Sequence, residues 1–274
     1  SIIEKVRDAL KSTFLNSAEE ANQQAKVIIR ERKFTPSTLA QAFILALLQN
    51  PEAGHADIAS VAAASGVDVS PQAIEQRYSK SLVAFFKILF EKMAKQIVAS
   101  EEILAPILSR FTEVVLIDSS VIGLPDSQQS EFQGCGGSYD ANQSAIKLQT
   151  EFDLVNGSLR CIELEQGRAP DGATDRQHIV QTKGSLRIAD LGYFNIPVLR
   201  RIDEAEAFFL SRVTHTTVVY VEGIKQNLVP WLNSLGRGTV DQIIELGASD
   251  RFQCRLVAWR VPEEIANTRR RKIR

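Results

Sequence analysis

The spacing of apolar residues changes near residue 110, and this change constrains the fold more than any other feature of the chain. Before it, apolar residues recur every three or four positions, as on one face of an α-helix. After it come the short apolar runs that are typical of strands, beginning with Val114–Ile117. We therefore expect a helical N-terminal domain, residues 1–108, followed by an α/β domain, residues 109–274.

Composition and charge narrow the class of protein. Hydrophobic residues make up 44% of the 274 positions and charged residues 24%, which is ordinary for a globular protein. No apolar run approaches the roughly 18 residues that a bilayer span needs, so we expect no membrane segment. Three cysteines are too few for a disulfide scaffold, which favours a reducing cytoplasm. The net charge is −1, and only residues 269–274 are strongly basic. Such a segment is either a solvated tail or a phosphate-binding segment.

Local signals predict where several helices begin and end. Thr35-Pro36 and Ser70-Pro71 each place a capping hydroxyl directly before a proline, which is typical of the first turn of a helix. Asn50-Pro51 predicts a stop, because proline donates no backbone hydrogen bond and restricts the residue before it.

One part of the helical domain has the pattern of a helix-turn-helix. An Ala-rich stretch, residues 57–64, is followed by a turn at Gly66 and by the Ser70-capped helix. The turn is about two residues longer than the tight form, so a plain helical hairpin stays an equal alternative. If the segment binds DNA, we expect the contacts to come from the second helix and the residues after it: Gln72, Gln76, Arg77 and Lys80.

A β-hairpin is the clearest local prediction in the second domain. Asn156-Gly157 lies between two strand-like runs, Ile146–Val155 and Ser158–Glu165, and this dipeptide favours a two-residue turn. That turn predicts one apolar face and one face with an opposite-charge pair. The expected cross-strand pairs are Leu154 with Leu159, Phe152 with Cys161 and Asp153 with Arg160.

Two apolar strands end in aspartate. Val114–Ile117 precedes Asp118, and Leu186–Ala189 precedes Asp190. If these two strands lie parallel and side by side, the two carboxylates adjoin and repel each other unless a divalent cation lies between them; Mg²⁺ or Mn²⁺ suits such oxygen ligands. Two such ions can activate a water or a 3′-hydroxyl for attack on a phosphodiester. Taken singly, each aspartate is more typical of a turn or cap.

Several motifs of the second domain occur in a familiar order. They are Leu116–Pro125, Phe132–Gly137 with Ala145–Gln149, Gly184–Phe194, Phe208–Val213, and Arg255–Val257 with the Arg-rich end. Together they resemble DDE-type insertion-sequence transposases, specifically the bacterial group with a β-rich insertion in a ribonuclease H-like domain. The likeness covers about residues 110–274, whereas the helical part matches only in general character.

The resemblance implies a fold and a set of site residues. The fold is α/β: a ribonuclease H-like mixed sheet (core 109–213) with a β-rich insertion (214–262) and a basic tail (263–274), preceded by the all-helical domain. Asp118 and Asp190 would be the first two catalytic, metal-binding carboxylates, with Mg²⁺ or Mn²⁺ as cofactor. Lys147 and Arg212 would contact DNA phosphate, although an ordinary surface role is an equal alternative. Tyr193 would support the second aspartate or serve as a core aromatic residue.

The same resemblance implies a function. We expect a DNA transposase that hydrolyses phosphodiester bonds at transposon ends and transfers strands into target DNA, as a homodimer on double-stranded DNA at the bacterial nucleoid. The family's third carboxylate is a Glu on a helix after the insertion, and we expect this sequence to lack it, because Glu263 and Glu264 do not fit that context. The alternatives are a truncated, non-catalytic DNA-binding or regulatory relative, and a metal-dependent nuclease without strand transfer.

Overall fold

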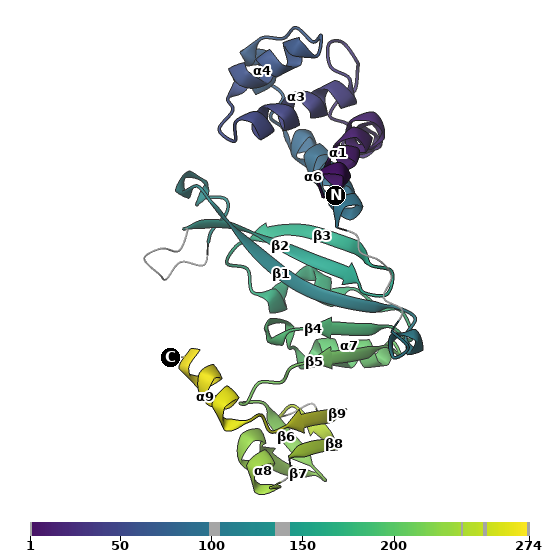
Figure 1. The fold of residues 1–274 in the computed structure, drawn as a ribbon, viewed down its shortest axis with the longest axis vertical. Helices are drawn as coiled ribbons and strands as arrows, with labels where there is room; N and C mark the ends of the chain where they lie inside the picture. The colour runs from purple at the N-terminus through teal and green to yellow at the C-terminus, as the bar shows by residue number, and fades with distance from the viewer. Residues whose placement is uncertain (1, 99–104, 135–142, 237, 249–250, 273–274) are drawn as a thin grey trace. The chain divides into compact units, whose positions relative to one another are not determined.

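The computed structural model describes residues 2–98, 105–134, 143–236, 238–248 and 251–272, with helices first and two β-sheets after them (Figure 1). Residue contacts divide the chain into two compact units, Ser1–Ile103 with Thr150–Leu164, and Leu104–Gln149 with Glu165–Arg274. Cys135, Gly136 and Gly137 of the predicted glycine loop lie outside the described residues. In the described part of the chain, no helix combines the length and apolar character needed to cross a bilayer.

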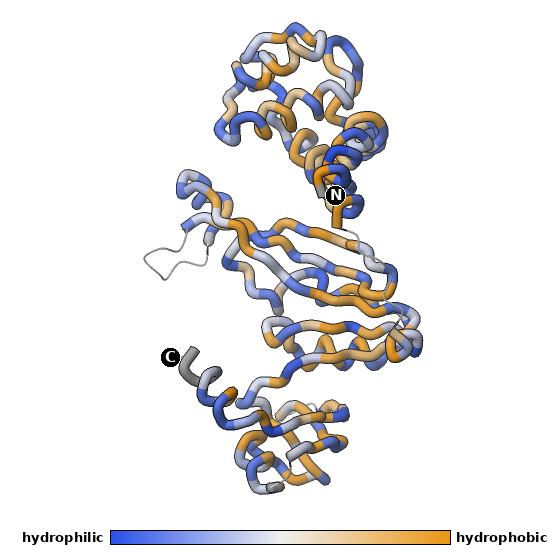
Figure 2. The backbone as a smooth tube through the Cα atoms, in the orientation of Figure 1, coloured by the Kyte–Doolittle hydropathy of each residue, from blue (hydrophilic) through white to orange (hydrophobic). Residues whose placement is uncertain are grey.

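Polar and apolar residues are interspersed along each N-terminal helix (Figure 2), and the buried apolar residues form one core. The predicted helix starts are confirmed: the Thr35 hydroxyl accepts a hydrogen bond from the Thr38 amide, and the Ser70 hydroxyl accepts one from the Ala73 amide. The third helix ends before Asn50, as predicted. The helices are α1 (Ile2–Ser12), α2 (Ala18–Ala25), α3 (Pro36–Gln49), α4 (His55–Ala64), α5 (Pro71–Glu75) and α6 (Lys80–Ile97), with a π-helical turn at Thr13–Ser17.

The second helix of the predicted helix-turn-helix is shorter than the sequence indicated. α5 ends at Glu75, Gln76 and Arg77 lie in the following turn, and Lys80 is the first residue of α6. Helix α6 begins so soon after α5 because the Ser79 hydroxyl accepts a hydrogen bond from the Leu82 amide and caps α6. The expected DNA-facing residues therefore lie on three successive elements and not on one helix face.

The first sheet contains β1 (Val114–Leu124), β2 (Ser144–Asp153), β3 (Ser158–Gln166), β4 (Leu186–Ala189) and β5 (Phe208–Ser211). Its strand order is β3-β2-β1-β4-β5, and β4 pairs in parallel with both β1 and β5 (Figure 1). The predicted parallel pairing of the two strands that lead into Asp118 and Asp190 is thus confirmed. The prediction that both strands end there is wrong for β1, which continues past Asp118 to Leu124. The amphipathic helix α7 (Ile196–Glu204) follows β4 and buries Val198, Leu199 and Ile202.

The turn between β2 and β3 differs from the prediction. It has four residues, 154–157, and not two. A two-residue Asn-Gly turn needs both residues in the left-handed region, but here only Gly157 has a positive φ, +61°. The carboxylate of Asp153 accepts hydrogen bonds from the Val155 and Asn156 amides at 3.0 and 3.1 Å, which stabilises the longer turn. Since Leu154 lies in the turn and not in β2, the predicted cross-strand pair of Leu154 with Leu159 is wrong.

The insertion forms a second sheet of order β7-β6-β8-β9 but is not all-β. A helix that the sequence analysis missed, α8 (Leu228–Ser234), buries Leu228 and Trp231, and Pro230 sits in its first turn, where proline is tolerated. The predicted basic tail is also helical, as α9 (Glu263–Lys272). The strands are β6 (Val218–Val221), β7 (Ile224–Asn227), β8 (Thr239–Leu246) and β9 (Phe252–Trp259).

Candidate active site

Three charged residues form a row at one edge of the first sheet. The last aligned positions of three neighbouring parallel strands are Ile117, Ala189 and Ser211. The next residues along the chain are Asp118, within β1, Asp190, just after β4, and Arg212, just after β5, and all three are exposed. Since neighbouring strands lie about 4.8 Å apart, this register brings the two aspartates to adjoining positions, with a guanidinium on the next strand.

Backbone amides orient both aspartate side chains. Oδ1 of Asp118 accepts a hydrogen bond from the Ser119 amide at 2.8 Å. Oδ1 of Asp190 accepts one from the Gly192 amide, also at 2.8 Å, and so caps the tight turn Leu191–Tyr193. Each carboxylate is held by the strand or turn that carries it while it stays open to solvent. Such a pair can bind a cation or a hydrogen-bond donor from outside the protein.

Tyr193 is a buried aromatic residue beside the strands that carry this row, which fits the core role of the two that the sequence left open. Its ring is 1% exposed and packs with Val115, Ile117 and Ala189, while its hydroxyl donates to Oε1 of Gln149 at 2.6 Å. Burial raises the pKa of Tyr193, and the charges of the nearby carboxylates, including both strand-end aspartates, raise this pKa further. The phenol therefore stays protonated and acts as a hydrogen-bond donor in the floor of the site.

Lys147 lies inside the domain, with 8% of its side chain exposed. Its Nζ donates to Oδ1 of Asp171 at 2.8 Å and to the carbonyl oxygen of Ala169. Although partial burial opposes it, hydrogen bonds from Lys147 and Ser119 hold the pKa of Asp171 below its ordinary value. This geometry favours an internal role for Lys147 over the predicted phosphate contact. Asp171 itself was not singled out from the sequence.

Comparison with known proteins places these motifs in a family. The family described as "Transposase DDE domain" matches residues 109–273, which is more than half of the chain. The chain belongs to this transposase family. Insertion-sequence transposases are also similar to it: IS231B of Bacillus thuringiensis subsp. berliner (26% identical, 93% of this chain and 57% of the relative) and IS1151 of Clostridium perfringens (27%, 72% and 46%).

A third relative, the IS231E transposase of Bacillus thuringiensis subsp. finitimus, is 23% identical over 98% of this chain and 60% of its own length. The chain thus spans about half to three fifths of the curated transposases that it matches. Among solved structures, a piggyBac transposase synaptic complex with hairpin DNA covers 92% of this chain and 60% of that chain, at 10% identity and a TM-score of 0.35.

For a DDE transposase, the strand-end carboxylates have suitable chemistry for a divalent metal. Their oxygens are hard donors on exposed positions of rigid strands, as Mg²⁺ and Mn²⁺ prefer, and water can complete the coordination. Within the described ranges, no group of three or more His, Cys, Asp and Glu side chains is arranged to hold a metal. Among the described residues, this edge of the sheet therefore presents two exposed carboxylates and not a group of three.

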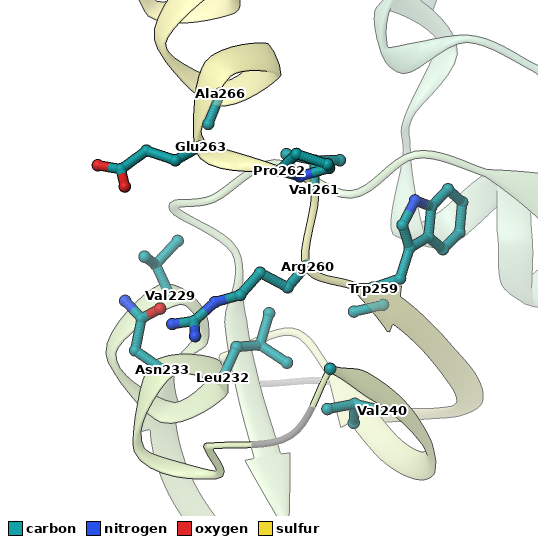
Figure 3. A pocket seen from close by; sticks show the side chains of 12 residues that line it. Val229, Leu232, Asn233, Val240, Trp259, Arg260, Val261, Pro262, Glu263 and Ala266 are labelled. Carbon is teal, nitrogen blue, oxygen red and sulfur yellow. The ribbon is translucent and has the colours of Figure 1, made fainter.

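A hollow in the insertion of this DDE domain is separate from the carboxylate pair. Its volume is about 1020 Å³, and it lies between α8 and the segment that joins β9 to α9 (Figure 3). Arg260 extends toward α8, near Asn233 and Leu232 (Figure 3). No residue of the strand-end row lines this hollow.

The predicted DNA-facing residues of the helical domain have mixed environments. Gln72, Gln76 and Lys80 are exposed. Arg77 is half-buried, and its guanidinium lies over the ring of Phe34, 5.3 Å from the centroid. Arg77 therefore contributes to the packing of this unit, whereas the other three side chains are accessible to a partner.

Proposed function

We propose that this chain forms the end-binding and catalytic parts of a DDE transposase, which hydrolyses phosphodiester bonds at the ends of an insertion sequence and joins them to target DNA. The observation that carries the proposal is the parallel pairing that puts exposed Asp118 and Asp190 at one sheet edge. The strand order β3-β2-β1-β4-β5, with parallel β1, β4 and β5, supports a ribonuclease H-like core.

In this proposal Asp118 and Asp190 hold Mg²⁺ or Mn²⁺. When bound, a divalent ion lowers the pKa of an attacking water or hydroxyl and neutralises charge on the leaving oxygen. The chain's own contribution is position, because the sheet fixes both carboxylates and their backbone hydrogen bonds fix the side chains. Arg212 brings a permanent positive charge to the same edge, where it would bind a phosphate of the substrate DNA.

Double-stranded DNA is the proposed partner of the helical domain as well. Gln72 and Gln76 have amide groups that pair with base edges, and Lys80 carries a charge for phosphate. Because a reaction at two transposon ends needs a site for each, we propose that two copies act together on the bacterial chromosome. Arg77 contributes to the packing beneath this surface.

The test is charge removal at each aspartate. We expect Asp118→Asn and Asp190→Asn in the whole protein to reduce Mg²⁺-dependent cleavage of end DNA more than 100-fold. Substitution of residues that only support metal ligands costs up to roughly 100-fold, and in this proposal the two aspartates are the ligands themselves. Binding of end DNA should change by no more than a few-fold. Asp203→Asn, on the exposed side of α7, is the matched control. Cleavage by both variants at the level of this control would refute the proposal.

A second function is favoured by one observation: the described part of the chain brings two carboxylates together and not three. A DNA-binding regulator that occupies transposon ends without cutting them would need neither aspartate. For such a protein, Mn²⁺ binding by the wild-type chain would be no tighter than by Asp118→Asn, and end DNA would be bound but not cleaved. Mn²⁺-dependent cleavage that is lost in Asp118→Asn supports the transposase instead.

A further inference from the structure

A buried lysine fixes the segment that precedes the second aspartate's strand. Lys147 and Gln149 occupy buried positions of β2, where polar side chains need hydrogen-bond partners within the protein. A buried ammonium is stable only when it is paired and hydrogen-bonded, and Lys147 achieves this through Asp171 and the Ala169 carbonyl. The ion pair therefore holds the loop at 169–171 against the middle of β2.

One carboxylate oxygen of Asp171 connects this ion pair to the first aspartate's strand. Oδ1 accepts a hydrogen bond from the hydroxyl of Ser119 at 2.8 Å, in addition to the bond from Lys147. Ser119 directly follows Asp118 on β1, and its amide is the donor that orients the Asp118 carboxylate. Asp171 thus holds the residue that holds Asp118.

The other oxygen of Asp171 faces the turn that carries the second aspartate. A Cβ atom added to Gly192 would lie 2.8 Å from Oδ2 of Asp171 and 3.2 Å from Oδ1 of Asp190, so both carboxylates converge on this one backbone position. The approach from the other side is less tight, because a Cβ on Gly172 would lie 3.3 Å from the carbonyl oxygen of Gly192. A side chain at position 192 would therefore force the Asp171 carboxylate to shift.

We propose that Asp171, clamped by Lys147, is a positioning residue that fixes the spacing of Asp118 and Asp190. Its side chain accepts a hydrogen bond from Ser119, the residue after Asp118 on β1, and lies beside Gly192, two residues after Asp190 in the turn that follows β4. A metal site tolerates displacements of only about 0.5 Å in its ligands, so such a link bears directly on metal affinity. The inference rests on the proposed function, because it assigns the two strand-end aspartates to the metal.

The first test removes the link to β1 and leaves the ion pair intact. We expect Ser119→Ala to weaken Mn²⁺ binding to the chain about tenfold, measured from the paramagnetic resonance signal of free Mn²⁺, as for other supports of metal ligands. Ser119→Thr keeps the hydroxyl and should restore binding to within twofold. Ser120→Ala, one residue along the same strand, is the matched control and should change neither binding nor the midpoint of thermal unfolding.

The second test closes the approach of the two turns. Gly192→Ala places a methyl group in contact with Oδ2 of Asp171 and should weaken Mn²⁺ binding at least as much as Ser119→Ala. Gly238→Ala is the control, because a Cβ there meets no atom within 4 Å. Unchanged Mn²⁺ affinity in Ser119→Ala and Gly192→Ala, with affinity lost in Asp118→Asn, would overturn the positioning role alone. Unchanged affinity in Asp118→Asn and Asp190→Asn would overturn the proposed function.

Discussion

Breaking the Lys147–Asp171 ion pair should cost different amounts of stability from its two sides. The Lys147 side chain is 8% exposed and that of Asp171 is 26% exposed. Asp171→Asn leaves an ammonium ion in the interior, for which losses of about 3–5 kcal/mol are typical. Lys147→Met leaves a carboxylate that still has the Ser119 hydroxyl and partial contact with water, so we expect a smaller loss, about 1–3 kcal/mol.

Urea unfolding of the wild type, of Asp171→Asn, of Lys147→Met and of the double variant with both substitutions measures this asymmetry. Because the double variant contains neither charge, it should be more stable than Asp171→Asn alone, and the two single effects should not add. The unfolding free energy comes from linear extrapolation, with an unchanged slope showing that the variants unfold from comparable native states. Equal losses for both single variants, or simple additivity, would refute the argument that a buried ammonium dominates.

The same pair predicts how stability depends on pH. The pKa of Asp171 lies below its ordinary value of 3.8 in the folded state, so the folded protein binds this proton less readily than the unfolded chain does. The resulting stabilisation is present above pH 3.8 and is lost as the pH falls through the lower folded pKa. Lys147→Met should therefore lose less stability than the wild type between neutral pH and this acidic range. An identical pH profile for both proteins would show that the ion pair does not lower this pKa.

Three further outcomes follow from local geometry. Thr35→Ala removes the cap of α3 and should lower the unfolding free energy by about 1 kcal/mol in urea unfolding. Gly157→Ala should lower it by about 1–2 kcal/mol, because φ is +61° there, and no loss would contradict the left-handed turn. Lys80→Ala should reduce the salt dependence of end-DNA binding: the slope of the logarithm of the binding constant against the logarithm of the salt concentration should fall by about 1. Lys95→Ala on the same helix should leave this slope unchanged.

Local sequence determines much of this fold. A capping hydroxyl before proline places the starts of α3 and α5, since side chain and backbone donor lie within four residues. Asp118 and Asp190 could be proposed for a similar reason, because each follows a short apolar run, although only β4 ends there and β1 continues to Leu124. Their meeting in space required one topological assumption, the parallel pairing of two distant strands, which the structure confirms.

Other features were missed because two local preferences compete. Asn156-Gly157 favours a two-residue turn, but the Asp153 carboxylate binds the next two amides and stabilises a four-residue turn instead. Helix α8 was missed because it has only seven residues, too few for an apolar period to repeat. α5 is short because Ser79 starts a new helix four residues after Glu75.

Asp171 escaped prediction because nothing within its own loop distinguishes it from any turn aspartate. Its partners lie on three other segments: Lys147 on β2, Ser119 on β1, and the turn around Gly192. A signal was nevertheless present in β2, where Lys147 and Gln149 alternate with the apolar residues Ile146 and Leu148. If that face points inward, the lysine requires a carboxylate partner from elsewhere in the chain.

Gly192 also depends on a contact with a distant segment, in its case through the backbone. In the sequence it follows the second aspartate by two positions, which suggests only a tight turn. The structure gives it a second requirement, since its missing side chain is the space into which Asp171 extends. The residues that carry the proposed chemistry are therefore visible from short apolar runs, whereas the residues that hold them in place depend on contacts between distant segments. A search for supporting residues should accordingly begin with charged side chains on buried strand positions and with glycines beside the candidate ligands.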